Sequence, residues 1–158
     1  MPVDPPSTLR PEPLSALLET HPEVVEVAAF PADEEALAAL EEALGYALPA
    51  DLRDFYGVSD GATLHSPTQV AHLASVEELA AWVAEGLVDA LEAVPIANDT
   101  GGGLLVCDAR GDWGGSPGAI YRLRAGRTAG YWPVHDAVRV AGSLRELLDH
   151  LVAGREPW

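Results

Sequence analysis

Cys107 and the five histidines are the side chains of this sequence best suited to nucleophilic or metal chemistry. A nucleophilic site needs Ser, Cys or Thr beside a base that a third group orients. Cys107 lies in the run LLVCDA with no histidine nearby, and the sequence has no G-x-S-x-G motif. A single cysteine in an apolar strand is usually a small buried side chain. The sequence therefore predicts no catalytic residue, and we expect no enzymatic activity.

The histidines lack the spacing of a metal site. His65 and His72 flank a predicted loop, and His135 stands beside Asp136 in another loop. A helical zinc site would place two histidines four residues apart, and other zinc sites use paired cysteines. The remaining two histidines lie at predicted helix ends, where histidine is favourable without a metal. We therefore predict neither a metal nor a cofactor.

The stretch Thr100-Gly101-Gly102-Gly103 is similar to a phosphate-binding loop only in its glycines. It lacks the G-K-[ST] ending of a P-loop, and a strand is predicted after it where an anion-binding loop would need a helix. We interpret it as a hairpin turn in which glycine allows a positive φ. Asp99, just before it, has two interpretations: an Asx turn with its own backbone, or a residue that contacts a ligand or partner.

Asp112 and Trp113 favour binding to a protein. They lie in a glycine-rich loop over 110–118, and tryptophan is a common anchor at interfaces. The alternative is that Trp113 folds back to cover the sheet. Tyr131 and Trp132 are adjacent near the end of a predicted strand, so they point to opposite faces and one is expected to be exposed. The residues that we predict to bind a partner are Asp60, Asp99, Asp108, Asp112, Trp113 and Trp132.

Charge is distributed unevenly along the chain. Residues 1–92 contain 18 Asp and Glu against two Arg, a net charge of −16, whereas residues 93–158 contain seven acids and seven arginines. An acidic half repels the phosphates of nucleic acid. It favours a basic protein partner, which electrostatic attraction would guide to the surface. The alternative is that the charge only keeps the protein soluble.

The length and the apolar pattern predict one soluble domain. A chain of 158 residues can bury a proper core, and no run of about 18 apolar residues could cross a membrane. The N-terminus has no secretory signal pattern, and a single cysteine suits a reducing cytoplasm. The absence of lysine, with abundant alanine, glycine and arginine, is compatible with a high-GC bacterial genome. We expect a loose proline-rich arm over 1–12 and one domain over 13–158.

Helical signals dominate the first part of the chain. Asp33 can cap a helix whose leucines recur at helical spacing until Gly45, and Pro49 suits the start of a second helix over about 50–58. Further helices are predicted over 13–20, 75–91 and 143–151. The last two begin with the capping-box patterns S-V-E-E and S-L-R-E.

Short β runs separated by glycine turns dominate the second part. Strands are predicted over 94–97, 104–109, 119–124 and 128–133, and extended segments over 24–30, 62–66 and 70–73. Residues 138–140 either belong to the sheet or lead into the last helix. This order predicts an α+β fold. Its sheet would be mostly antiparallel, with about four to six strands and the helices packed on one face.

The segment from 30 to 62 resembles the signature segment of the SUKH superfamily. It combines an acidic helix start with Leu-Glu-Glu-x-Leu-Gly, Leu-Pro-x-Asp-Leu-Arg-x-Phe-Tyr and Asp-Gly. The matching residues are Leu40, Glu41, Leu44, Gly45, Leu48, Pro49, Asp51, Leu52, Phe55, Tyr56, Asp60 and Gly61. A second SUKH-like segment is formed by Pro95, Ile96, Ala97, Asp99, Gly102, Gly103, Leu104, Leu105 and Asp108. The resemblance implies an α+β fold.

The SUKH superfamily includes bacterial immunity proteins that neutralise toxins and fungal regulators of cell-wall synthesis. The resemblance and the acidic first half favour a bacterial immunity protein that binds a cognate toxin, with a basic nuclease as the natural target. One alternative is a regulatory scaffold that binds cellular proteins. Another is a small ligand-binding or hydrolase domain that uses a cleft at the sheet.

Overall fold

The computed structural model describes residues 13–28, 30–124 and 136–158. The predicted arm over 1–12, the predicted strand over 128–133 and Trp132 lie outside this part of the chain. None of the helices in these ranges is long and apolar enough to cross a membrane.

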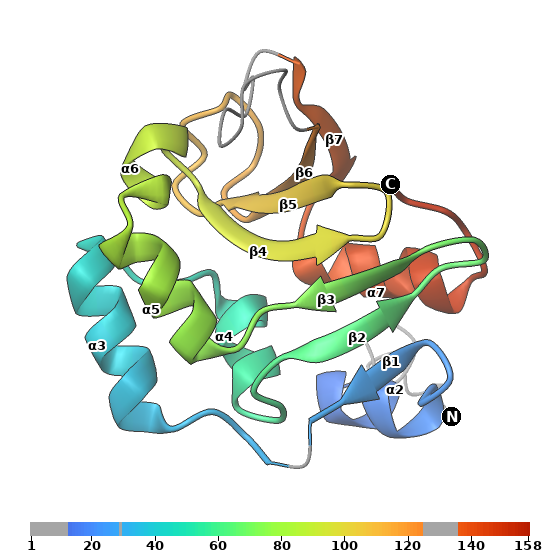
Figure 1. The fold of residues 1–158 in the computed structure, drawn as a ribbon. Helices are drawn as coiled ribbons and strands as arrows, with labels where there is room; N and C mark the ends of the chain where they lie inside the picture. The colour runs from blue at the N-terminus through green and yellow to red at the C-terminus, as the bar shows by residue number, and fades with distance from the viewer. Residues whose placement is uncertain (1–12, 29, 125–135) are drawn as a thin grey trace, which may run out of the picture.

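The described residues form an α+β fold around one antiparallel sheet. Its strands are β1 (Val25–Val27), β2 (Ala62–His65), β3 (Val70–Leu73), β4 (Val94–Asp99), β5 (Gly103–Asp108), β6 (Ala119–Arg124) and β7 (Val138–Ala141). Each strand pairs with the next one in the chain, in the order β1 to β7 (Figure 1). The seven strands of this sheet exceed the four to six that we predicted. Strands of three or four residues, such as β1 and β7, are too short for alternation to distinguish them.

Six helical segments accompany the sheet in the described ranges. They are α2 (Leu14–Thr20), α3 (Glu34–Leu44), α4 (Ala50–Tyr56), α5 (Val76–Ala84), α6 (Leu87–Leu91) and α7 (Leu144–Val152). The predicted limits of α3 are confirmed: the Asp33 carboxylate accepts the Glu35 N–H at 3.1 Å, and Gly45 ends the helix at φ +84°. Helix α4 begins after Pro49 as predicted and ends at Tyr56, two residues earlier than expected.

The single helix predicted over 75–91 is two helices in the structure. Gly86 has φ +80°, a left-handed conformation that interrupts the α-helix between α5 and α6. The capping box of α5 is complete, with Ser75 and Glu78 each accepting the backbone N–H of the other. The predicted box of α7 forms only in half, because Glu146 accepts the N–H of Gly142 while Ser143 accepts that of Glu146.

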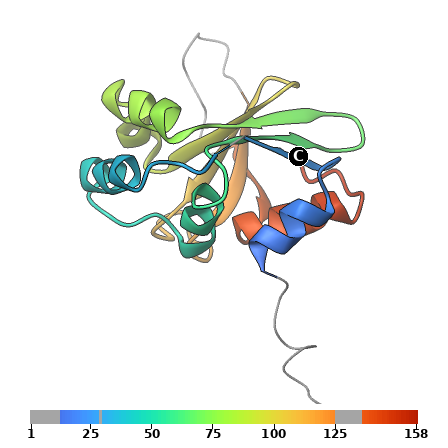
Figure 2. The same ribbon diagram turned by 90° about the horizontal axis from the view of Figure 1, so that it is seen from below.

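Two clusters of buried apolar side chains lie on opposite faces of the sheet. On β5, Leu105 and Cys107 belong to the larger cluster, whereas Leu104 and Val106 belong to the smaller one. Helices α2, α3, α4, α5 and α7 supply side chains to the larger cluster, and α6 supplies Leu91 to the smaller. In Figure 2, α2, α4 and α7 lie below the sheet, while α3, α5 and α6 lie together at the left of the view.

Candidate functional site

The signature segment ties three helices together through buried or half-buried polar contacts. Glu41 of α3 accepts the Leu48 N–H at 2.7 Å and the Arg53 Nε–H at 3.1 Å, which joins α3 to α4. Asp51 accepts the N–H of Arg145 at 3.0 Å at the start of α7. The carboxylates of Glu41 and Asp51 therefore hold the fold together.

Asp99 is fully buried and paired with Arg122 of β6. The Arg122 Nε lies 2.7 Å from Asp99 Oδ2, and the other carboxylate oxygen accepts the N–H groups of Gly101 and Gly103 at 2.9 Å. Burial alone would raise the pKa of Asp99, but the Arg122 and backbone hydrogen bonds outweigh it and hold the pKa below its usual range. A Cβ at position 103 would meet Arg122 Nε at 2.4 Å, so this pair requires glycine there.

Asp108 shapes the glycine-rich loop that follows β5. Its side chain is 1% exposed, and its two carboxylate oxygens accept the N–H groups of Asp112 and Trp113, both at 3.0 Å. Trp113 turns back onto the sheet and packs against Tyr121, with the ring centroids 5.0 Å apart. Trp113 therefore covers the sheet, as the alternative interpretation of the sequence predicted. The carboxylate of Asp108 positions the loop.

Asp60 and Asp112 lie at the surface, beside two adjoining hollows. Asp60 helps to line a groove of about 420 Å³ between α3 and α5, and Asp112 lines a second hollow of about 330 Å³. Both hollows have Ala43, near the end of α3, in their lining, so they adjoin each other at this residue. The structure therefore places these two predicted residues beside neighbouring hollows, and Asp99 lines neither of them.

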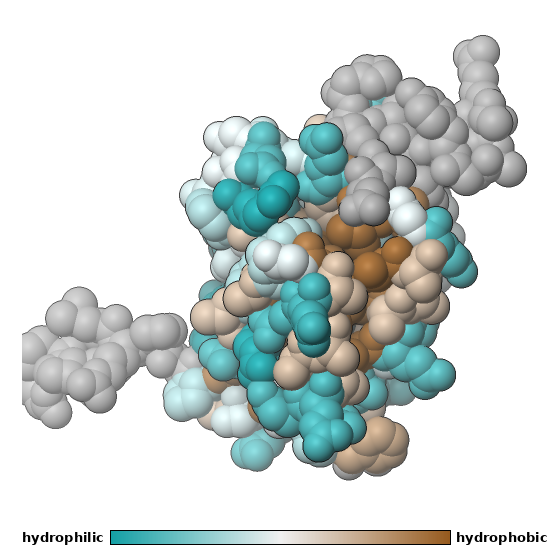
Figure 3. Space-filling view, turned by 90° about the vertical axis from the view of Figure 1, so that its left-hand side faces the viewer, coloured by the Kyte–Doolittle hydropathy of each residue, from teal (hydrophilic) through white to brown (hydrophobic). Residues whose placement is uncertain are grey.

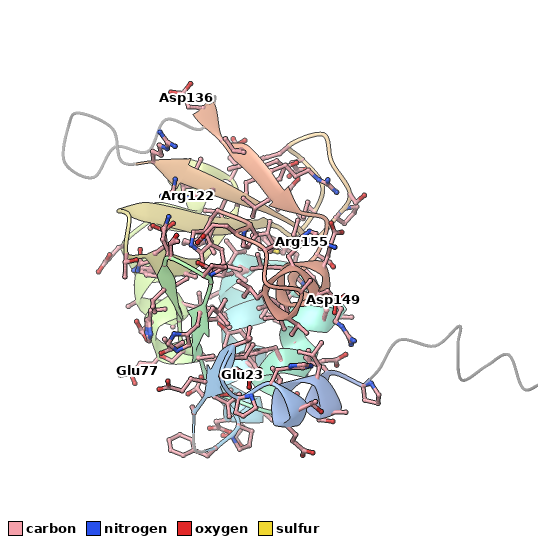
Figure 4. The ribbon with its side chains drawn as sticks, turned by 90° about the vertical axis from the view of Figure 1, so that its right-hand side faces the viewer. Glu23, Glu77, Arg122, Asp136, Asp149 and Arg155 are labelled. Carbon is pink, nitrogen blue, oxygen red and sulfur yellow. The ribbon has the colours of Figure 1, made fainter. Side chains whose placement is uncertain are left out.

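The groove between α3 and α5 is lined mainly by small apolar side chains. Alanine, leucine and valine form its walls, and three carboxylates line it as well: Ala36, Ala39, Leu40, Ala43, Val76 and Ala80, with Asp33, Asp60 and Glu77. The face that carries α3, α5 and α6 shows a band of tan and brown side chains between teal ones (Figure 3). Figure 4 shows Glu77 well apart from Arg122, so the buried Asp99–Arg122 pair is not part of this groove.

The second hollow is more polar. Arg110 stacks over the Tyr46 ring, 5.0 Å from its centroid, and forms an ion pair with Asp112 at 2.7 Å. Burial raises the pKa of the Tyr46 hydroxyl, and the nearby Arg110 only partly offsets this rise. Glu92 also lines the hollow and has φ +57°, which is uncommon for a residue with a side chain. The hollow thus presents fixed charges of both signs.

The described residues offer neither an exposed thiol nor a cluster of metal ligands. Cys107 lies in the core, 1% exposed, where burial raises its pKa to about 12, so it is no accessible nucleophile. Across residues 13–28, 30–124 and 136–158, no three His, Cys, Asp or Glu side chains gather in a group that could hold a metal ion.

Sequence reasoning missed the groove itself. Ala39 and Ala43 are exposed on α3, and Ala80 is exposed on α5. A signal was present, because Ala36, Ala39 and Ala43 recur at helical spacing beside the buried leucines. These alanines make the apolar face of α3 wider than the stripe of leucines that packs into the core. A groove forms only because α5 packs beside this face.

Two comparisons with known proteins bear on this fold and surface. A search of curated proteins found no match. The sequence model of the SMI1 / KNR4 family (SUKH-1) matches residues 31–150, which include the signature segment, the groove helices, the sheet from β2 to β7 and most of α7. The match confirms the predicted resemblance, and the chain belongs to the SMI1 / KNR4 family of the SUKH superfamily.

Proposed function

We propose that this chain is a non-enzymatic, cytoplasmic protein-binding domain of bacterial origin, an immunity protein that binds and neutralises a cognate toxin. Membership of the SUKH family supports an immunity or regulatory protein-binding role. The single observation that carries the proposal is the groove between α3 and α5, an apolar depression bordered by Asp33, Asp60 and Glu77. Such a surface combines contact area with charge for a basic partner.

Among the residues predicted from sequence, Asp60 and Asp112 are the proposed contacts with the partner. Asp99 and Asp108 act indirectly, because their buried carboxylates hold the turn before β5 and the loop after it. Trp113 supports the same loop from the sheet side through Tyr121. Trp132 stays a predicted contact.

The acidic first half of the chain favours a basic toxin, such as a nuclease. A nuclease must attract phosphate, so its active site carries positive charge that an acidic inhibitor can cover. Residues 1–92 carry the whole net charge of −16, and they include both α3 and α5.

Co-expression with the product of the neighbouring gene tests this proposal. We expect the two proteins to co-purify and the chain to restore growth to cells that the neighbouring product inhibits. A product that is harmless, or that stays toxic and unbound in the presence of the chain, would refute the immunity role. It would favour the alternative of a regulatory scaffold that binds cellular proteins.

A further inference from the structure

The exposed side chains that line the groove between α3 and α5 include three alanines, which project only a short distance from the helix backbones. Ala39 and Ala43 project from α3 and Ala80 from α5, and all three are exposed. Small side chains let another backbone approach closely, as happens where helices pack with short separations. The groove therefore suits a partner element whose own backbone comes near the two helices.

We infer that the α3–α5 groove binds a basic amphipathic helix of the partner. This inference rests on the proposed function and specifies which kind of partner element the groove recognises. An extended strand is disfavoured there. Strand addition needs a free sheet edge, whereas the backbone groups of α3 and α5 are bonded within their helices or capped. An extended chain would leave its own N–H and C=O groups unpaired against alanine walls, and a helix satisfies them internally.

The charge around the groove selects a basic occupant. Helices α3 and α5 contain no arginine or lysine and six glutamates, and Glu85 follows directly after α5. Glu35, Glu42, Glu77 and Glu85 are exposed, and their carboxylates have no hydrogen-bond or ion-pair partner in the part of the chain that the structure describes. Arginine or lysine on the flanks of an incoming helix would pair with such groups. A second copy of this chain would bring the same negative charge and is repelled.

The dimensions of the groove fit a short helix. Helix α3 has 11 residues, which corresponds to a length of about 16 Å, or roughly three helical turns. The N-terminal residues Asp33 and Val76 of the two helices line one end, and Ala43 lies where the second hollow begins. An occupant of about three turns would match the length of α3 along the groove.

The test uses a synthetic probe. We choose a hydrocarbon-stapled peptide of about 15 residues, with alanine and leucine on one face and arginine on both flanks. Its controls are the same peptide with glutamate in place of arginine, and an unstapled version with a central proline that stays extended. Fluorescence anisotropy with the full chain at low salt measures the dissociation constants, and only the stapled basic peptide is expected to bind.

Alanine-to-tryptophan variants, each with a control on the same helix, test whether the peptide binds in the groove. Ala39→Trp and Ala80→Trp fill the groove, whereas Ala38→Trp and Ala81→Trp add the same side chain at exposed positions of the same helices that do not line it. We expect the groove variants to weaken peptide binding about tenfold or more, and the controls to change it less than about twofold. Circular dichroism of all four checks that each one folds.

The same four variants are then tested for neutralisation of the neighbouring gene product. Loss of neutralisation in the two groove variants alone, with peptide binding lost in parallel, supports the inference. Three results would overturn the inference of a helical occupant. They are equal peptide binding by all four tryptophan variants, stronger binding of the extended peptide than of the stapled one, and salt-sensitive self-association of the chain through the groove. Neutralisation that survives both groove variants also overturns it and leaves the immunity role standing. Peptide binding without any neutralisation by the wild-type chain refutes the immunity role alone.

Discussion

Individual carboxylates in this chain have different tasks that residue type alone does not reveal. Asp99 and Asp108 are buried and bonded to neighbouring groups, whereas Asp112 is exposed and ion-paired with Arg110. The difference lies in what surrounds each side chain. A buried carboxylate needs compensating hydrogen bonds, and these bonds fix nearby backbone. Substitutions at these positions should therefore affect stability at Asp99 and binding at Asp112.

Asp99→Asn should lower the free energy of unfolding by about 3 kcal/mol at pH 7, because Arg122 would lose its charged partner in a largely buried site. Urea unfolding followed by circular dichroism measures this change. An effect below about 0.5 kcal/mol would show that the pair contributes little to stability.

The contribution of Asp99 should also depend on pH. Its folded pKa lies below that of the unfolded chain, so the stabilisation is complete above the unfolded pKa of about 4. It is lost as the pH falls through the folded pKa, because the unfolded chain binds the proton more readily. The gap in unfolding free energy between wild type and Asp99→Asn should therefore narrow from pH 6 towards about pH 2.5. A gap that is constant over this range would contradict the assigned pKa direction.

Cys107 should be unreactive in the folded protein. Its side chain is buried, and its pKa is raised to about 12, so little thiolate exists at neutral pH. Labelling with a thiol reagent at pH 8 should proceed only after urea is added. Fast labelling of the native chain would place Cys107 in an accessible position and reopen the question of its chemistry.

At the scale of the elements, Asp60 links stability to binding. Its Oδ1 accepts the N–H of Val76 at 2.9 Å, so it caps the start of α5 while it lines the groove. Asp60→Ala should cost about 1 kcal/mol of stability, and Asp60→Asn should cost less because the amide oxygen can still accept this bond. Thermal unfolding compares the two variants, and equal destabilisation would rule out the cap as the cause.

That comparison also separates the two roles of Asp60. Asp60→Asn removes the charge and keeps the cap, so weaker association with a basic partner by this variant would report on electrostatics. Glu19→Gln is a suitable control, because Glu19 is an exposed residue of α2 on the other side of the molecule. Unchanged association of Asp60→Asn would remove Asp60 from the proposed contacts.

The elements with local signals were the ones predicted well. Asp33, Gly45 and Ser75 act through neighbours a few residues away, and all three have their predicted roles in the structure. The break at Gly86 was missed, because glycine inside an apolar helical pattern can be either tolerated or helix-ending. The Asp99–Arg122 pair was missed as well. Its members are 23 residues apart in the sequence, and only the pairing of β4, β5 and β6 brings them together.

The groove could not be predicted for a similar reason. Its two walls come from helices separated by α4, β2 and β3, and a surface between such elements depends on how they pack. The resemblance to the family predicted the fold class, while the acidic composition predicted only the sign of the partner's charge. The groove exists only where α3 and α5 pack side by side, and no local sequence signal reports that packing.

At the scale of the whole molecule, the separation of charge along the chain should control association kinetics. The acidic residues 1–92 create a long-range negative field, and salt screens such a field over a Debye length of about 10 Å at 0.1 M. The association rate constant with a basic partner should therefore fall by about tenfold or more between 20 and 500 mM NaCl. The dissociation rate constant should change much less, because the apolar groove is insensitive to salt.

Stopped-flow fluorescence at a series of salt concentrations measures both rate constants. Glu77→Gln and Glu85→Gln together should reduce the slope of the association rate against ionic strength. A salt-independent association rate would mean that the charge serves solubility alone, the alternative interpretation of the composition.

The simple order of the sheet has a consequence for synthesis on the ribosome. Because every strand from β2 to β7 pairs with the strand just before it, each can add to the sheet as soon as it leaves the exit tunnel. The groove helices α3 and α5 also precede the larger part of the sheet. The groove between α3 and α5 can therefore assemble during translation, before α7 arrives and its first turn bonds to Asp51. The proposed binding groove would thus be formed before the last helix closes the fold.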